Sequence, residues 1–523
     1  MTLTPNRHLL AALTLVLATA IAPSAVQAQS TVNVGAFGAD AGKLDPHLSG
    51  GGQDTALFAY LFNGLSRFKP GSMEPKNIEL DLATSIEPAD ASGKVWTVVL
   101  RKGVQFHGGY GELKAADVVW SLDRVRDPKT SGFASTFGVI DAVEALDDYT
   151  VKVTLKDRVP TFIGLLADPQ GGYILSKKAH EELGTDVKAA MVGTGPFQFV
   201  AYTPKAQVTL KANDQYFRGK PRLEQIVYRY IPSDNARELA FASGQIDLFY
   251  GRREQDWVDR MNKQYGEKIS IDIFAPSQSR MLHLNENVKP LDDIRVRKAI
   301  AHAIDRSEFQ ALVGKSITKP LTKPVPSGFL GQAETVPVYD FDPAKSKSLL
   351  KEAGYADGFT LKVPSTQIAS LKLPFELVME QLRRVGIKLQ VDFVDHRAWH
   401  ALIRRDESPL VIYGAAPFPT ADAFLTPFFH SQSIVGSSTA QTNFSHCKVA
   451  DAEIDAARAE SDPIKQIKDW QLAQQKIMQQ VCVVPIFELQ QVWGRRKTLD
   501  LGYELEGSLT LGPPITEKTH FVK

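Results

Sequence analysis

The stretch NVKPLDDIRVRKAIAHAIDR, residues 287–306, carries the clearest structural signal of the chain. Asp292 or Asp293 can cap the exposed amides of a first helical turn. The apolar residues that follow recur at helical spacing and predict one buried face: Val296, Ala299, Ile300, Ala303 and Ile304. The basic residues lie off this face: Arg295, Arg297, Lys298 and Arg306. The stretch therefore predicts a capped amphipathic helix on a larger core.

Length and charge limit the class of protein. A chain of 523 residues with 43% hydrophobic content can bury a large core, divided among about three domain-sized units. The 60 Lys and Arg residues almost balance the 59 Asp and Glu residues. A nucleic-acid-binding protein normally shows a basic excess, so we expect no nucleic-acid partner.

The first 28 residues have the composition of a secretory signal. Arg7 precedes an apolar run at residues 9–21, and the small residues Val26 and Ala28 follow. We predict cleavage after Ala28 and a soluble exported protein. The run is too short to span a bilayer comfortably, and a buried N-terminal helix is the alternative.

The two cysteines, Cys447 and Cys482, lie far from this cleavage point, where a lipid-anchored exported protein would need one. An exported protein can form a disulfide. Their spacing alone leaves a bridge and two separate buried thiols equally open.

Strand and helix patterns alternate through the chain. Period-two patterns predict strands at residues 32–38, 94–100 and 149–156, and a strand pair at 206–213 and 225–232. Helices are predicted at 115–127 and 234–244. A strand at 359–364, a helix at 375–385 and a strand at 388–395 predict a parallel crossover unit. The fold class is therefore α/β.

Catalytic motifs are weak. SLLK at 348–351, SDN at 233–235 and KTSG at 129–132 superficially match penicillin-recognising serine enzymes, but their order along the chain is reversed. SLLK also fits an ordinary helix face. We predict no catalytic residue, and a secreted hydrolase remains a distant alternative.

His396 and His400 stand at i and i+4, a spacing that can chelate a metal ion. No third ligand lies nearby in the sequence. We interpret the pair as part of a solvated helix face and predict neither a metal site nor a cofactor.

An ordered set of segments is similar to the extracellular solute-binding proteins of family 5, the peptide, oligopeptide and nickel receptors of ABC importers. Residues 287–306 resemble a hallmark helix of that family. KLDPH at 43–47, LRKGVQFHGG at 100–109, KAADVVWSLDR at 114–124, GTGPFQFVAY at 193–202 and ARELAFASGQIDL at 236–248 follow the family order. Each segment alone is weak, but the ordered set is specific and spans nearly the whole mature chain.

The resemblance implies a periplasmic-binding-protein-like two-lobe clamp of type II, with three domains, one of them an insertion. Domain I would comprise residues 29–61, 198–284 and 500–523, after a signal peptide at 1–28. Domain II would be 62–197 and domain III 285–499. The helix at 287–306 would then be scaffold of the second lobe, with its arginines free for carboxylates across domains.

The resemblance also implies that the protein binds a solute and catalyses no reaction. We expect a monomeric periplasmic receptor that closes on a solute, most simply a peptide, and delivers it to membrane permease subunits with their ATPases. A non-peptide solute is the alternative: an opine-like conjugate, an oligosaccharide or a nickel complex. The residues expected to line the ligand are Leu48, Ser49, Gly50, Gly51, Gly52, Tyr413, Gly414, Ala415, Ala416, Pro417, Phe418, Asn443 and Phe444.

Two departures from the dipeptide receptors bear on the ligand. The dipeptide receptors hold the ammonium of the ligand with an aspartate, and the corresponding position in this chain falls near Pro417. They hold the carboxylate of the ligand with an arginine, and the corresponding loop in this chain is residues 364–367, PSTQ. We therefore expect a neutral pocket that binds free dipeptides poorly, unless Arg404, Arg405 or another distant charge anchors them. A longer peptide, or an uncharged or conjugated solute, fits this expectation.

Overall fold

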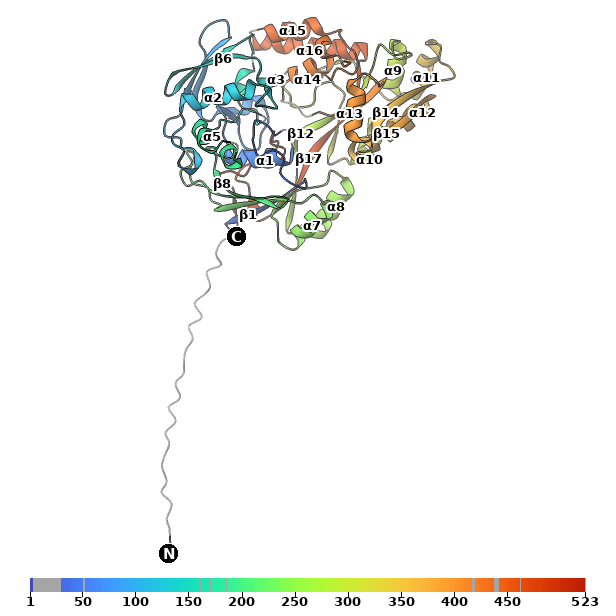
Figure 1. The fold of residues 1–523 in the computed structure, drawn as a ribbon. Coiled ribbons are helices and arrows are strands. Elements are labelled where there is room, and N and C mark those ends of the chain that lie inside the picture. Colours follow the sequence, from blue (N-terminus) through green and yellow to red (C-terminus); the bar gives the residue numbers. More distant parts are fainter. Residues whose placement is uncertain are drawn as a thin grey trace.

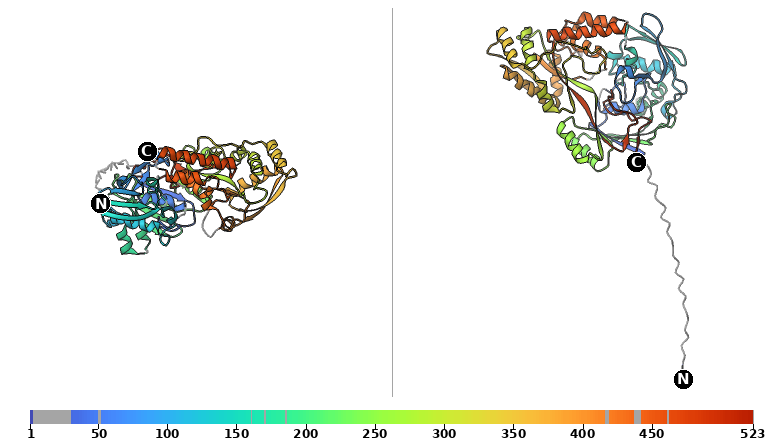
Figure 2. Two further views of the ribbon diagram at one scale, coloured as in Figure 1. Left: turned by 90° about the horizontal axis from the view of Figure 1, so that it is seen from above. Right: turned by 180° about the vertical axis from the view of Figure 1, so that it is seen from behind.

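The computed structural model describes residues 1–2, 30–49, 52–159, 161–169, 171–184, 186–415, 419–436, 442–460 and 462–522. The predicted signal peptide thus lies almost entirely outside the described residues. Figures 1 and 2 show two lobes side by side, one formed mainly by the first half of the chain and the other by the second half. Within the described ranges, we find no helix with the length and apolarity that a membrane span requires.

The first lobe is built on a large mixed sheet with the strand order β16-β12-β17-β11-β1-β10-β9-β8, and β13 pairs with β17. Strand β1 lies parallel to β10 and β11, whereas β9 is antiparallel to both β8 and β10, which confirms the predicted strand pair. The bounds are β1 Thr31–Ala36, β8 Phe197–Thr203, β9 Gln207–Ala212, β10 Gln225–Tyr230, β11 Leu248–Tyr250 and β13 Thr318–Pro320. Helices α1 Gly52–Leu61, α7 Asp234–Ala242 and α8 Gln255–Tyr265 pack around it.

Two long strands of this sheet continue into the second lobe. They are β12 (Ile269–Leu284) and β17 (Val483–Arg496). Their pairing is interrupted between Phe274 and Gln278 and again between Arg280 and Met281. Such irregularities bend a strand and increase its local twist. The paired strands therefore form a continuous connection between the lobes, with its bend in the middle (Figure 1).

A separate antiparallel sheet in the order β4-β5-β7-β6 has its own hydrophobic core. Trp96, Val118 and Val151 belong to this core, because alternate residues of β5 and β7 and one face of α2 point inward. The elements of this region are β2 Ser66–Phe68, η1 Pro75–Asn77, β3 Ile78–Leu80, β4 Ala83–Pro88, β5 Val95–Leu100, η2 His107–Gly109, α2 Ala115–Arg126, α3 Ala134–Phe137, β6 Ile140–Asp147, β7 Thr150–Leu155, α4 Phe162–Leu165, α5 Lys177–Leu183 and α6 Val187–Ala190.

The second lobe contains the predicted crossover unit. Strands β14 and β15 are parallel and flank α12, which confirms the prediction made from residues 359–395. The bounds in this lobe are α9 Ile294–Ala303, α10 Arg306–Val313, α11 Pro343–Glu352, β14 Phe359–Thr366, α12 Ala369–Arg384, β15 Ile387–Val394, α13 His396–Arg404, β16 Leu410–Tyr413, α14 Asp422–Phe429, η3 Ser431–Ser433, α15 Asp451–Ala459 and α16 Pro463–Gln480. Strands β18 Leu499–Asp500 and β19 His520–Phe521 close the chain on the first lobe.

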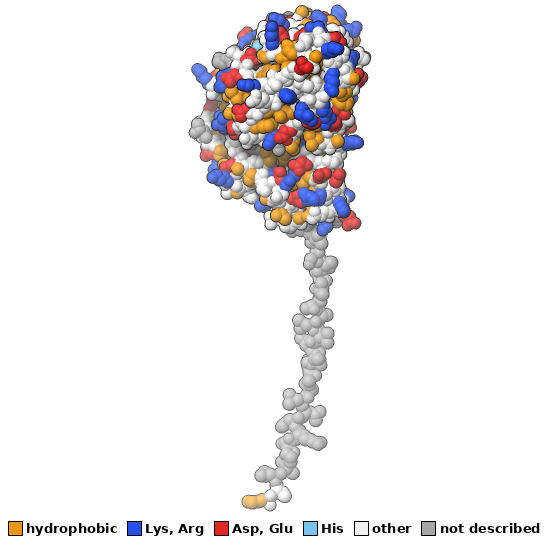
Figure 3. All heavy atoms as spheres, turned by 90° about the vertical axis from the view of Figure 1, so that its right-hand side faces the viewer, with side chains coloured by type: hydrophobic (Ala, Val, Ile, Leu, Met, Phe, Trp, Pro, Cys, Tyr) orange, Lys and Arg blue, Asp and Glu red, His pale blue; other side chains and the backbone are white. Residues whose placement is uncertain are grey.

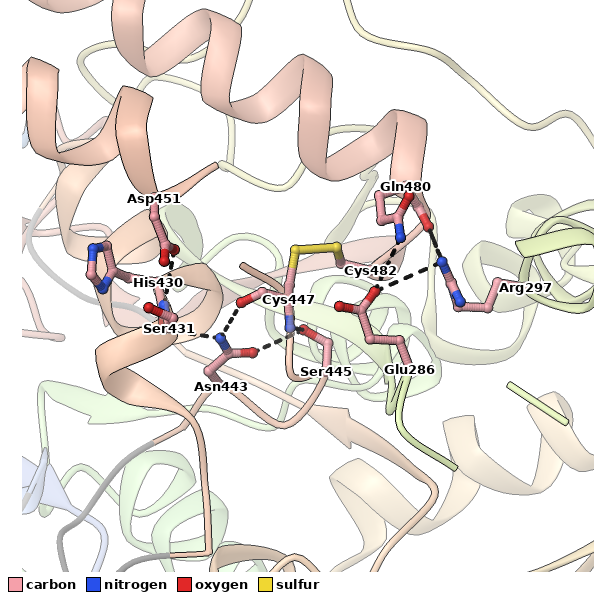
Figure 4. The surroundings of a disulfide bond; sticks show 10 residues. All are labelled: Glu286, Arg297, His430, Ser431, Asn443, Ser445, Cys447, Asp451, Gln480 and Cys482. Carbon is pink, nitrogen blue, oxygen red and sulfur yellow. Dashed lines mark hydrogen bonds and ion pairs between the residues drawn. A yellow bond between two sulfur atoms is a disulfide. The ribbon is translucent and has the colours of Figure 1, made fainter. Parts of the chain in front are cut away.

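Helix α9 begins as predicted, with Asp293 accepting the amide of Arg295. The expectation that its arginines reach carboxylates across domains is wrong. Arg297 is buried and donates to the backbone carbonyls of Leu291 and Gln480, with Glu286 3.8 Å away (Figure 4). A buried guanidinium needs several acceptors, and backbone carbonyls in the turn before α9 and at the end of α16 supply them.

Cys447 and Cys482 form a disulfide (Figure 4). It joins the segment before α15 to the residue that precedes β17. Asn443 lies beside it in the core and donates to the carbonyls of Cys447 and His430. The bridge therefore ties the end of α16 and the start of a connecting strand to the body of the second lobe.

One face of the molecule carries surface charges of both signs. On the face drawn in Figure 3, Lys and Arg side chains are interspersed with Asp and Glu side chains. This distribution agrees with the near-neutral composition.

Candidate functional site

A cavity of about 550 Å³ lies where the lobes meet beside the connecting strands. Its size is that of a small-molecule site. The first lobe and the connecting strands contribute Phe37, Gly52, Tyr250, Arg253, Gln278, Arg280, Gln491 and Leu511. The second lobe contributes Ile368, Ser370, Leu371, His396, Trp399, His400, Tyr413 and Gly414. None of these described lining residues is an aspartate or a glutamate.

Arg280 is the most unusual lining residue, because it is a charge in the middle of a buried strand. Its side chain is 4% exposed. It donates to the backbone carbonyl of Ser279 and to Oε1 of Gln278, both at 3.2 Å, while its Nε has no partner among the described residues. Burial, reinforced by the nearby Arg253, lowers the pKa of Arg280 to about 9.

Arg253 shares the same acceptor, since its Nη1 lies 3.0 Å from Oε1 of Gln278. One neutral amide oxygen thus holds two guanidinium groups together. Within the described part of the chain, neither arginine makes an ion pair with a carboxylate. Like charges in a poorly solvated site repel strongly, so this arrangement is costly unless an anion joins it.

Gly414, directly after β16, makes room for Arg280. A Cβ atom at this position would overlap the Arg280 guanidinium. The next residue, Ala415, accepts hydrogen bonds from the backbone amide and the hydroxyl of Ser279 at 3.0 and 3.2 Å. A side chain at position 414 would therefore displace the Arg280 guanidinium from its observed position.

The start of α1 brings backbone to the cavity at Gly52. Asp54 fixes this turn from inside the protein: it accepts from the Gly42 amide at 2.8 Å and the Tyr230 hydroxyl at 2.9 Å. Burial raises the pKa of Asp54 and its hydrogen bonds oppose that rise. Its carboxylate is thus used by protein donors and does not line the cavity.

Helix α13 supplies the opposite wall. Trp399 is buried, with the ring of His396 stacked on it at 5.5 Å and Tyr413 stacked at 6.1 Å. His400 lies 4.5 Å from His396 between ring centroids. Burial, followed by the positive charges of His396 and Arg404, lowers the pKa of His400 to about 4. Burial also lowers the pKa of His396.

The expectation of a solvated histidine face is therefore wrong. Both rings are partly buried and line the cavity, because the apolar side of α13 packs on β14 and β16 and turns this edge of the helix toward the first lobe. No cluster of three or more His, Cys, Asp or Glu side chains that could hold a metal ion occurs among the described residues.

Some of the residues expected to line a ligand do line the cavity, and others do not. Gly52, Tyr413 and Gly414 line the cavity. Leu48 and Ser49 are not lining residues, and the hydroxyl of Ser49 donates to the carboxylate of Asp54.

Ala415 does not line the cavity, and its carbonyl accepts the two hydrogen bonds from Ser279. Asn443 and Phe444 lie in the core, Phe444 with its ring 5.0 Å from that of Tyr413. The remaining expected residues fall outside the described ranges: Gly50, Gly51, Ala416, Pro417 and Phe418.

The expectation of a neutral pocket is also wrong, because it overlooked Arg253 and Arg280. The named alternatives do not supply the charge: Arg404 contacts the hydroxyl of Tyr413, and Arg405 pairs at the surface with Glu407 at 2.6 Å. Arg280 follows Ser277, Gln278 and Ser279 in the sequence, so the local pattern does not indicate that this charge would be buried beside a cavity.

A second, larger cavity of about 1180 Å³ lies farther out between the lobes. The first lobe contributes Lys94 and Lys156, and the second lobe contributes Asp455 from α15. Other lining residues come from the segment just before β6 and from helices α14, α15 and α16, all of which are labelled in Figure 1. The lobes therefore share an inner cavity near the connecting strands and an outer cleft.

Two lobes that are joined by paired strands and share a cavity define a solute-binding clamp. The chain belongs to the bacterial extracellular solute-binding proteins, family 5, whose model matches residues 77–435. The family consists of binding proteins. The serines of the weak catalytic motifs have ordinary structural contacts: Ser348 bonds to Glu352 at 3.0 Å, and Ser233 caps α7.

Relatives cover almost the whole chain. The glutathione-binding protein GsiB of Escherichia coli K12 is 29% identical over 509 residues, which is 94% of this chain and 96% of that protein. The structure of MoaA from A. tumefaciens R10 in complex with mannopinic acid is 43% identical, with a TM-score of 0.81 over 95% of this chain and all of that one. DppA from Helicobacter pylori, in complex with the peptide STSA, is 26% identical, with a TM-score of 0.77 over 95% of this chain and 99% of that one.

Proposed function

We propose that this protein captures a carboxylate-bearing solute in the inner cavity, with Arg253 and Arg280 as its anchors. The observation that carries the proposal is the guanidinium pair in a cavity whose described lining holds no acid. Leaving a charge buried and unpaired costs several kcal/mol, on the order of 3–5 kcal/mol where a partner is removed. A ligand carboxylate bound by both arginines removes that cost.

A conjugated solute of the opine kind is the first candidate for this carboxylate-bearing ligand. The relative that is 43% identical was solved with mannopinic acid, which supports the non-peptide alternative. A short acidic peptide is the second candidate, because several relatives are glutathione-binding proteins and glutathione carries two carboxylates.

Capture would proceed by closure of the lobes about the bend in β12 and β17. The closed protein would present its ligand to the permease subunits of an ABC importer, whose ATPases supply the energy. We place the mature protein in the periplasm as a monomer, with export followed by cleavage after Ala28. The intact mass of exported protein tests the cleavage, since a chain that retains residues 1–28 would contradict it.

The ligand proposal is tested by calorimetry on purified protein freed of co-purified ligand by mild denaturation. The panel is mannopinic acid, its amide derivatives, glutathione, free dipeptides and end-blocked peptides. We expect acids to bind and their amides to bind at least tenfold more weakly. Arg280→Met should weaken acid binding by about 30- to 1000-fold, equivalent to roughly 2–4 kcal/mol.

Arg397→Met is the matched control, because Arg397 is an exposed arginine of α13 that does not line the cavity. Its dissociation constants should equal those of the wild type. Equal binding of acids and amides, or unchanged acid binding by Arg280→Met, would refute the proposed function.

A further inference from the structure

The outer cleft has opposite charges on its two walls. The first lobe contributes three cationic side chains and one acid: Lys94, Lys156, Arg158 and Asp157. The second lobe contributes three acids and one cationic side chain: Asp422, Asp455, Glu460 and Arg458. The described lining of this cleft contains no residue of β12 or β17, so these charges stand away from the bend about which the lobes are expected to close.

Two exposed charges on opposite walls are Lys156, directly after β7, and Asp455 on α15. Lys156 makes no ion pair with any residue that the structure describes, whereas its neighbour Lys94 pairs with Asp157 of the same lobe at 3.4 Å. The side chain of Asp455 is 61% exposed, with Nε2 of His430 3.3 Å from its carboxylate. Both charges are therefore accessible to a partner on the facing wall.

The one cationic side chain of the second-lobe wall lies beside a different acid. Nε of Arg458 is 4.0 Å from Oδ1 of Asp422, and the hydroxyl of Thr426 donates to the same oxygen at 2.9 Å. Arg458 thus leaves Asp455 available to the cleft, and the wall stays acidic overall.

We propose that the outer cleft is an electrostatic latch, in which Lys156 of the first lobe and Asp455 of the second lobe attract each other and favour the closed state. The inference rests on the proposed closure of the lobes, and neither residue lines the inner cavity. Closure displaces a surface in proportion to its distance from the bend, so unlike charges far from the bend approach each other strongly. Their attraction grows as the distance falls and as water leaves the space between them.

Such a latch changes solute affinity without contact with the solute. The apparent dissociation constant is the constant of the binding-competent state divided by the population of that state in the empty protein. Attraction across the cleft raises the population of the closed state and tightens binding. Reversal of one charge turns the attraction into repulsion, so we expect binding to weaken about 3- to 10-fold, the scale of one or two exposed ion pairs.

Calorimetry with mannopinic acid on Lys156→Glu, Asp455→Lys and the double variant tests the latch. Each single variant should bind about 3- to 10-fold more weakly. The double variant has opposite charges in exchanged positions and should return to within about twofold of the wild type. Direct attraction of an anionic solute predicts the reverse for Asp455→Lys, because this variant adds positive charge, so its weaker binding is specific to the latch.

Lys188→Glu is the matched control, because Lys188 on α6 is an exposed first-lobe lysine that lines neither cavity and has no ion pair among the described residues. Its affinity should equal that of the wild type. Solution scattering of the ligand-free proteins is the second measurement: each single variant should have a larger radius of gyration than the wild type, and the double variant should not. If Asp455→Lys does not fold, Lys156→Glu carries the test, because Lys156 has no ion pair to lose.

Unchanged affinity in the single variants, or single effects that simply add in the double variant, would overturn the latch. This failure is distinguishable from failure of the proposed function. If the wild type binds mannopinic acid and contracts while the charge variants behave like it, capture and closure stand and the latch falls. If the wild type does not bind carboxylate solutes, the proposed function falls, and the scattering of the ligand-free variants decides on the latch.

Discussion

Replacing Arg280 with methionine should stabilise the empty protein while it weakens binding of the carboxylate ligand. Burial lowers the pKa of Arg280 from the ordinary value of an arginine side chain to about 9 in the folded protein. At 1.36 kcal/mol for each pH unit, this fall corresponds to roughly 5 kcal/mol of unfavourable charge burial. Methionine fills a similar volume without a charge, so the variant avoids this cost.

Part of the gain is lost again, because the hydrogen bonds to Ser279 and Gln278 disappear. Each neutral hydrogen bond contributes about 1 kcal/mol, so we expect a net increase of about 1–3 kcal/mol in the free energy of unfolding. The gain should be constant at pH 6–8, where Arg280 is charged in both the folded and the unfolded chain. Above pH 9 the folded wild type releases the proton while the unfolded chain keeps it. The stability of the wild type therefore rises with further increase in pH, and the advantage of the variant shrinks.

The assay is denaturant unfolding of ligand-free protein, followed by calorimetry with the carboxylate panel. Arg297→Met is the contrasting variant, because the buried guanidinium of Arg297 satisfies backbone carbonyls of Leu291 and Gln480. It should lose about 3 kcal/mol or more of stability. A destabilised Arg280→Met protein with normal ligand affinity would show that Arg280 is a structural arginine like Arg297.

Four further outcomes are expected. Reduction of Cys447–Cys482, or its replacement by serines, should cost about 4 kcal/mol of unfolding free energy for a sequence separation of 35; an unchanged denaturation midpoint would contradict this. Saturating ligand at 100 times its dissociation constant should add about 2.7 kcal/mol of stability, and it should shrink the particle in solution scattering; superimposable scattering curves would argue against closure. His396 and His400 should not bind nickel or zinc at micromolar concentration, and heat of binding that disappears in His400→Ala would disprove this. Burial lowers the pKa of His283 from 6.5 to about 3, so only the unfolded chain gains a proton between these two pH values. The free energy of unfolding should therefore fall by about 2 kcal/mol from pH 6.5 to pH 5. His283→Phe should remove this contribution to the pH dependence of stability.

Local sequence patterns determined the elements whose stability comes from nearby residues. The crossover unit of β14, α12 and β15 and the capped helix α9 follow from apolar spacing and from Asp293 as a cap. These features depend on contacts within about 40 residues, so the periodic pattern of apolar residues is sufficient to predict them.

The same patterns could not separate arginines that look alike in the sequence. Arg295 and Arg297 are two positions apart on one helix, yet Arg295 pairs with Asp293 at the surface while Arg297 is buried. The difference depends on Gln480, whose carbonyl comes from the end of α16 and is nearly 200 residues away in sequence. Burial of a polar residue is decided by which distant acceptors arrive beside it.

The cavity shows the same division between sequence and tertiary structure. The sequence by itself determined an α/β protein with family-specific segments in order, and it singled out Gly52, Tyr413 and Gly414, which line the cavity. Only the tertiary structure decided that Arg280 shares an acceptor with Arg253 and lines the same cavity as His400, because three separate segments of the chain meet there. Electrostatic energy depends on distance and burial in three dimensions, and a one-dimensional pattern does not encode either quantity for residues so far apart in the chain.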